Sequence, residues 1–315
     1  MITRQVTCGA SGEMSDLVAA IVATGRSLRQ EEKKLFRLQN QTAAPVVGHL
    51  MAEVPPEEQG TKEAFQKLWP QALSIIGKAL AGGDRDEVLA LAAGQGLPEL
   101  LCLSLASSWE ALQPLGRFHA DLIKRLEALA RKLPCYPRAR LLSGLAEKGL
   151  GRIVAEAGDI GMYANPAKLW KRFGMHVVDG VAAKHVKGEG SGFSSPRRAI
   201  IWAIAASQVR LVKHKGKVVE RDEAGLPLPG GPYRLLYTDR KAYELARGLK
   251  KSHAHMRAVR YVAKRILRDV WRIWHGQEVR YENFDVAIEG SEFTWSGLMD
   301  AFEEGGPDDG QEEAA

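Results

Sequence analysis

The chain has 315 residues, of which 45% are hydrophobic, 26% charged and 7% aromatic, values typical of a globular protein with about two domains. Its net charge of +6 hides an asymmetry, because residues 131–280 hold 31 Lys and Arg against 12 Asp and Glu. The remainder is acidic. A segment this basic favours a polyanionic partner, DNA with RNA left open, over a surface that is merely solvated.

The cysteines and the apolar segments limit the compartment. The three cysteines, Cys8, Cys102 and Cys135, fit neither a zinc pattern nor a disulfide framework, which favours a reducing environment. No segment approaches the run of about 18 apolar residues that a membrane span needs, and the N terminus lacks a signal-peptide pattern. We therefore expect a cytoplasmic protein with no membrane association, no metal site and no cofactor.

Residues 1–133 are expected to form a helical N-terminal region. Apolar residues recur at helical spacing from Glu13 to about Gln39, a proline- and glutamate-rich stretch at 54–60 breaks the chain, and a longer helix is predicted over 107–132 with Ser107 as its cap. These helices are the candidate surface for a protein partner or for homo-oligomers. The sequence LPCYP at 133–137 ends them, and the charge balance changes there.

A second domain is predicted over 138–280, so that the fold class is mostly α. Helices are expected over 196–211, 237–250 and 252–275, and the last of them has an apolar face with arginines elsewhere. That face holds Met256, Val259, Ala263, Ile266, Val270 and Trp274. Short strands are predicted near 177–182 and 217–220. Residues 301–315, with six acidic residues and no basic one, are expected to be a disordered tail.

The segment from Leu141 to Trp170 has the layout of a helix-hairpin-helix. A turn at Gly144-Leu145-Ala146 separates two short helices, and Asn165-Pro166 opens a third. Free N–H groups at the start of the second helix would hold a backbone phosphate, with Lys148 and Arg152 adding side-chain contacts. The alternative is a helical hairpin that only packs against its neighbours. Glu147 favours this alternative, because it places a negative charge where the phosphate would lie.

Further basic residues are candidates for contact with nucleic-acid backbone. They lie in a glycine-rich loop, at the start of one helix and along the last helix. The complete candidate set is Gly144, Leu145, Ala146, Lys148, Arg152, Lys184, Lys187, Arg197, Arg198, Arg257, Arg260, Lys264 and Arg268. Three tryptophans in the same region could stack on bases, but their helical spacing on apolar faces favours positions in the core: Trp202, Trp271 and Trp274. No catalytic residue is predicted.

Several fragments together resemble a known domain. They are GLAEKGLGRIVAEAGD at 144–159, YANPAKL at 163–169, FGM at 173–175, the helix start SPRR at 195–198 and AVRYVAKRIL at 258–267. In this order and spacing they resemble the C-terminal domain of the DEDD-type insertion-sequence transposases and Piv-like DNA invertases, over roughly 138–275. The resemblance implies DNA binding in transposition or recombination of mobile elements.

Two features of the family are not matched. Its members open with a ribonuclease-H-like domain whose carboxylates hold magnesium ions, whereas this chain opens with helical, acidic sequence. The family's serine nucleophile would fall near Val181-Ala182-Ala183, and the nearest hydroxyls are those of Ser191, Ser194 and Ser195. We therefore expect a DNA-binding protein related to transposases but without its own nuclease centre. The alternatives are an active transposase or recombinase component that uses a serine of 191–195, and a non-enzymatic protein-interaction scaffold.

Overall fold

The computed structural model describes residues 12–140, 145, 147–178, 181–183, 192–209, 213–214, 217–218, 232–277 and 279. Most of these residues are helical, which confirms the mostly-α class. The helices are α1 Gly12–Ala52, α2 Lys62–Ala79, α3 Arg85–Ala93, α4 Glu99–Arg131, α5 Tyr136–Arg140, α6 Glu147–Ala157, the 3-10 turn η1 Ile160–Met162, α7 Pro166–Arg172, α8 Ser195–Gln208, α9 Pro232–Ala246 and α10 Lys251–Trp274. Within the described residues, none of these helices is long and apolar enough to cross a membrane.

The strands in the described residues form two very short antiparallel pairs. Strand β1, Val177–Val178, pairs with β2, Val181–Ala182, and β3, Lys213–His214, pairs with β4, Lys217–Val218. The first pair lies where the sequence predicts a short strand near 177–182, whereas of the second pair only β4 lies in the predicted range 217–220 and β3 precedes it. They add little to a fold that helices build.

Two of the predicted helix boundaries in the N-terminal region are wrong. Helix α1 does not end near Gln39 but continues through Pro45 to Ala52, and buried Ala43, Val46 and Val47 extend its apolar face. Helix α4 begins at Glu99, so Ser107 lies inside it and is not a cap. In both cases burial of an apolar stripe outweighs the local signals, because proline or serine disfavours a helix by only a few kcal/mol.

The contacts within the chain divide it into two compact units. One unit is Thr24–Arg125, which we call the balanced unit because it holds 12 Lys and Arg against 12 Asp and Glu. The other comprises the described residues of 1–23 and 126–315, which we call the basic unit. Helices α1 and α4 thus each belong to both units. The sequence places the boundary at 133–138, a few residues after this division, and the acidic segment 301–315 lies outside the described residues.

The balanced unit has a core of its own. Buried residues of α1, α2, α3 and α4 meet in one cluster, with Ala72, Val88 and Ala106 completely buried. Thr61 and Asp84 begin α2 and α3, and each side chain accepts a hydrogen bond from a backbone N–H of the first turn. These caps stabilise short helices that are otherwise marginal.

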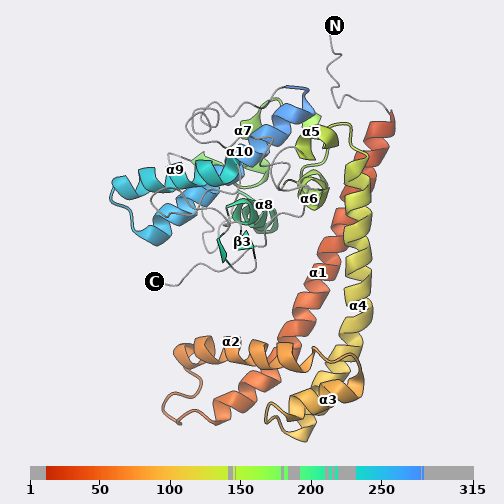
Figure 1. Cartoon of the computed structure of the whole chain (residues 1–315), viewed down its shortest axis with the longest axis vertical. Helices are drawn as coiled ribbons and strands as arrows, with labels where there is room; N and C mark the ends of the chain where they lie inside the picture. Colours follow the sequence, from red (N-terminus) through yellow and green to blue (C-terminus); the bar gives the residue numbers. More distant parts are fainter. Residues whose placement is uncertain are drawn as a thin grey trace. The chain divides into compact units, whose positions relative to one another are not determined.

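The basic unit is built around α10, which packs against α9, α8, α7 and α5 (Figure 1). Its predicted apolar face is buried as expected, with one exception: Met256 is 50% exposed, because it lies in the first turns of α10 beside a pocket described below. Trp271 and Trp274 lie in this packing and donate hydrogen bonds to the carbonyl oxygen of Tyr163 (2.6 Å) and to Asp159 (3.1 Å). These bonds fix η1 and the start of α7 against α10.

Candidate functional site

Helix α7 places three cationic side chains on one face. Asn165 caps the helix by accepting a hydrogen bond from the N–H of Lys168 (3.1 Å), and Pro166 occupies the first turn. Lys168, Lys171 and Arg172 follow at positions i, i+3 and i+4, which lie on the same side of a helix. All three are exposed. The Asn-Pro start predicted from the sequence is confirmed.

The first turn of α8 adds a hydroxyl and a guanidinium. Ser194 occupies the position before the helix, but its hydroxyl accepts no hydrogen bond from the first turn. An N-cap serine normally makes that bond, so this hydroxyl remains available for a ligand. Arg197 follows three residues later on the same side.

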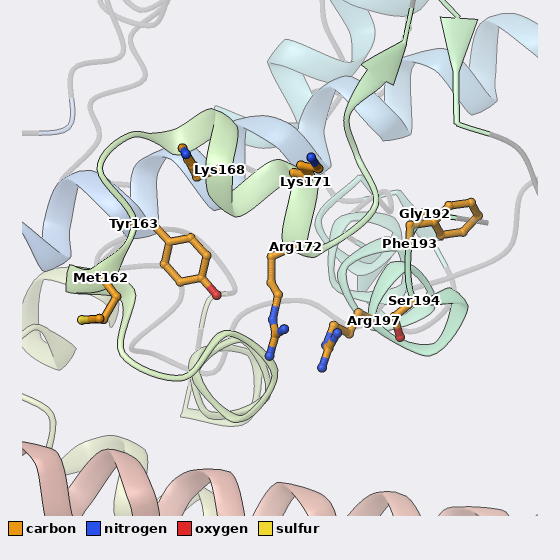
Figure 2. A pocket seen from close by; sticks show the side chains of 9 residues that line it. All are labelled: Met162, Tyr163, Lys168, Lys171, Arg172, Gly192, Phe193, Ser194 and Arg197. Carbon is orange, nitrogen blue, oxygen red and sulfur yellow. The ribbon is translucent and has the colours of Figure 1, made fainter. Parts of the chain in front are cut away.

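These residues meet around one pocket of about 700 Å³, which we call the basic pocket. It is lined by Met162, Tyr163, Lys168, Lys171, Arg172, Gly192, Phe193, Ser194 and Arg197. Figure 2 shows the side chains of Arg172 and Arg197 lying near one another, with Tyr163 beside them and Ser194 next to Arg197. The pocket therefore gathers two guanidinium and two ammonium groups.

One buried carboxylate supports this cluster from behind. Glu156 of α6 is 4% exposed and lies 3.2 Å from the Nε of Arg197, while its backbone carbonyl accepts a hydrogen bond from the Nε of Arg172 (3.1 Å). Both arginines are thus oriented by contacts of their Nε atoms with Glu156. Among the described residues, those that line the pocket include no carboxylate, and neither lysine ammonium is in a salt bridge. The pocket carries a surplus of positive charge.

The positive potential extends behind α7 to His176. Burial lowers the pKa of His176, and the charges of Lys171, Arg198, Arg260 and Lys264 lower it further. Its Nδ1 is buried without a hydrogen-bond partner in the described part of the chain. The imidazole is therefore neutral at physiological pH. It adds no charge to the four cationic side chains around it.

A second pocket lies against the other side of the α8 start. It has a volume of about 780 Å³, and we call it the apolar pocket. It is lined by Ala182, Phe193, Ser195, Arg198, Ala199, Trp202, Ala203, Met256, Arg257 and Arg260. Phe193 lines both pockets. Three arginines predicted as contact residues thus come together here.

Two of those arginines are held in place by backbone carbonyls. Arg198 donates to the carbonyl oxygens of Gly174 (2.7 Å) and Ala183 (2.9 Å), and its guanidinium lies 3.4 Å from the centre of the Phe193 ring. Arg260 donates to the carbonyl oxygen of His176 (2.8 Å). Burial lowers the pKa of both guanidiniums. They remain charged, because an arginine does not lose its proton in a protein.

Other predicted cations serve the packing of α9 and α10. Arg257 pairs with the completely buried Glu244 (2.9 Å) and Arg268 with the completely buried Asp269 (3.0 Å). The ammonium of Lys264 lies 5.1 Å from the centre of the Trp170 ring, and burial followed by the charge of Arg260 lowers its pKa. The structure does not bring Lys264 or Arg268 into either pocket.

The predicted hairpin is described only in part. Leu145 is completely buried, so this residue is not on a surface that a phosphate could reach, whereas Lys148 is exposed and Arg152 half-buried. Gly144, Ala146, Lys184 and Lys187 lie outside the described residues.

Glu147, which argues against phosphate at the hairpin, is held by other groups. Its carboxylate accepts hydrogen bonds from the hydroxyl of Tyr136 (2.7 Å) and the Nε of Arg131 (3.0 Å), and these lower its pKa to about 2. The negative charge is therefore partly offset within the basic unit.

Sequence reasoning missed the cations of α7. The spacing of Lys168, Lys171 and Arg172 is the signal for a cationic helix face, whereas Asn165-Pro166 predicts only where the helix begins. Ser194, which the sequence offers only as an alternative nucleophile, lines the basic pocket. Trp202, predicted to be a core residue, is half-buried and lines the apolar pocket.

Comparisons of the chain with models of known families, with curated proteins and with solved structures found no match. The resemblance to transposases therefore stays a prediction. Within the described residues, no group of three or more His, Cys, Asp or Glu side chains is placed to hold a metal ion.

Proposed function

We propose that the basic unit binds duplex DNA through the sugar-phosphate backbone, with one phosphate in the basic pocket. The observation that supports this is the gathering of four cationic side chains and the uncommitted Ser194 hydroxyl around one pocket without a carboxylate in its lining. A phosphate supplies the missing negative charge and accepts hydrogen bonds from guanidinium, ammonium and hydroxyl groups alike. The positive end of the α8 dipole adds to the attraction.

Contacts to phosphate position a protein on a duplex without reading its bases. The two arginines are oriented through Nε by Glu156, so their terminal nitrogens are ordered before the strand arrives. Such preorganisation lowers the entropic cost of binding. We therefore expect an affinity that falls steeply with salt concentration and varies little with sequence.

The exposed Lys148 extends the same interface to α6. Helices α5 and α6 contact one another and are joined by residues 141–146. In this proposal they are the helix-hairpin-helix, and the basic unit corresponds to the C-terminal domain of the transposases. The chain would then be a DNA-binding component related to mobile-element transposases.

The test is a salt titration of binding to a fluorescent duplex. The double variant Lys168→Ala/Lys171→Ala is expected to reduce the slope of log affinity against log salt by up to about two units, since each lost phosphate contact contributes about 0.9. Lys148→Ala should reduce it by about one. The matched control is Lys67→Ala/Lys78→Ala on α2 of the balanced unit, which should leave the slope unchanged.

Two results would overturn this proposal. The first is no affinity for duplex DNA even at low ionic strength. The second is an equal loss of slope in the two double variants, which would make the binding a property of overall charge and not of the basic pocket.

A second candidate function is recombination chemistry by Ser194, because its uncommitted hydroxyl lies among the cations that would hold a phosphodiester. The hydroxyl oxygen would attack phosphorus and lose its proton, the bond between phosphorus and one deoxyribose oxygen would break, and that oxygen would take up a proton to leave as a DNA hydroxyl. Cleavage or joining of a plasmid in magnesium should then be abolished by Ser194→Ala. Activity that survives this substitution, or no activity in the unsubstituted protein, rejects this candidate.

A further inference from the structure

The apolar pocket has the chemistry of a site for a flat, aromatic ligand. Phe193 and Trp202 supply aromatic surface, and Met256 adds a polarizable side chain that is 50% exposed. Because Met256 is exposed beside the half-buried Phe193 and Trp202, this pocket presents apolar and aromatic surface to a ligand. Three arginines also line this pocket. A purely apolar ligand would cover their charged groups without pairing with them, so the ligand must carry polar atoms as well.

The two pockets lie against neighbouring stripes of one helix start. Ser194 and Arg197 line the basic pocket, whereas Ser195, Arg198 and Trp202 line the apolar pocket. Residues i, i+3 and i+7 form one stripe of a helix, so this alternation follows from the helical period. Figure 2 shows the ring of Phe193 turned away from Arg172 and Arg197, although the residue lines both pockets.

We infer that the apolar pocket receives an unpaired nucleobase of the DNA strand whose phosphate lies in the basic pocket. A nucleotide joins an anionic phosphate to a flat aromatic base, and adjacent basic and aromatic sites match those two parts. Stacking on aromatic side chains and arginine guanidiniums is how proteins hold bases that have left the helix. The inference rests on the proposed binding of DNA backbone.

The arginines of the apolar pocket fit this ligand. Arg198 lies over the Phe193 ring and is fixed by two carbonyl oxygens, so its guanidinium plane is ordered. Arg257 also lines this pocket, and 54% of its side chain is exposed, although its Nη1 lies 2.9 Å from Glu244. A fully paired duplex offers no base to this pocket, because all of its bases are stacked.

The test compares a paired duplex with the same duplex containing one extra, unpaired 2-aminopurine. We expect about tenfold tighter binding of the bulged duplex and a change in 2-aminopurine fluorescence when the base leaves the stack, since stacking of one base is worth this factor or more. Trp202→Ala should remove the preference and keep the affinity for the paired duplex. Phe65→Ala, an exposed aromatic on α2 of the balanced unit, is the matched control.

Met256→Glu tests the same pocket without changing a buried side chain. The side chain is half exposed, so the fold tolerates the change, and a carboxylate in the pocket wall should reduce binding of the bulged duplex more than that of the paired one. Deoxyadenosine monophosphate is the competitor that distinguishes a strand from a free nucleotide.

The outcomes separate this inference from the proposed function. Equal affinity for the two duplexes, or a preference that survives both Trp202→Ala and Met256→Glu, overturns the inference and leaves backbone binding intact. Competition by the free nucleotide as strong as that by the bulged duplex overturns the assignment to a DNA strand. No affinity for either duplex overturns both.

Discussion

The two compact units of the chain use their charges in opposite ways. The balanced unit has equal numbers of acidic and basic residues, and its ion pairs reach the surface: Arg85 and Glu110, 3.4 Å apart, are both about half exposed (49% and 53%). The buried carboxylate of Glu31 in this unit is held by the exposed Lys34. In the basic unit, Glu156, Glu244 and Asp269 are buried, and each is paired with at least one arginine.

This difference teaches that the net charge of a region does not say which of its cations can bind a ligand. Arg257 and Arg268 pair with buried carboxylates, so much of their charge serves the packing of α9 and α10. Lys168 and Lys171 have no such partner among the described residues. Unpaired positive charge therefore lies at α7, whereas Arg197 at the start of α8 shares its charge with Glu156.

The largest expected effect tests the buried carboxylates. Glu244→Ala should lower the free energy of unfolding by about 3 kcal/mol, since it leaves several arginines without their shared partner. Burial alone would raise the pKa of Glu244, but hydrogen bonds from Arg257 and Arg240 outweigh it and lower the pKa, so the carboxylate is charged. The measurement is urea unfolding followed by circular dichroism.

Glu110→Ala in the balanced unit is the matched control and should cost about 0.5 kcal/mol or less, because exposed ion pairs contribute little. Equal losses of unfolding free energy in the two variants would show that the buried carboxylate contributes no more to stability than the exposed one.

A smaller effect is expected at Gly174, which ends the α7 segment with φ of +65°. A Cβ added there would lie 2.9 Å from the Phe193 ring. Gly174→Ala should therefore cost about 2–3 kcal/mol, from the left-handed backbone and from overpacking together. It should also weaken DNA binding, because Phe193 lies between the two pockets.

Gly60→Ala in the balanced unit has a similar φ of +75° and open space around it, so it should cost only about 1 kcal/mol. Thermal unfolding of both variants gives the comparison. If Gly174→Ala were no worse than Gly60→Ala, Phe193 would not be packed as described.

The sequence predicted what depends on composition and helical period. The mostly-α class, the α10 core face and the Asn165-Pro166 helix start were found this way, because capping and amphipathicity are local signals. The continuation of α1 past Pro45 was not found, because burial against distant residues determines it. Among the described candidate cations, Arg197 is the one that lines the basic pocket. Lys168 and Lys171 also line it, but the sequence did not indicate them as candidates.

The reason lies in the carboxylates. Which arginines are neutralised depends on Glu156, Glu244 and Asp269, and their partners are separated from them by between one and 41 residues. Helical spacing in the sequence indicates the pairs of Glu244 with Arg240 and Arg247, but not those of Glu244 with Arg257 or of Glu156 with Arg197. The functional surface is what remains after these pairs have formed, so only the fold could define it.

The smallest expected effect concerns pH and a carboxylate that is neither buried nor at a pocket. Hydrogen bonds from Tyr136 and then Arg131 hold the pKa of Glu147 at about 2, below its ordinary 4.5. A lowered pKa stabilises the folded state above pH 4.5, and this contribution is lost as the pH falls from 4.5 towards 2. Because 24% of the side chain is exposed, water weakens the effect relative to that at Glu244.

Glu147→Gln should therefore lose less stability than the unsubstituted protein between about pH 5 and pH 3. In this range, which lies around the ordinary pKa of a carboxylate, Glu147 of the unfolded chain takes up its proton. Urea unfolding at each pH measures this, and Glu110→Gln controls for the other carboxylates of the chain. Parallel curves for all three proteins would mean that Tyr136 and Arg131 do not hold the Glu147 charge. In that case its negative charge would again oppose a phosphate at the start of α6, and the interface with DNA would be restricted to α7 and α8.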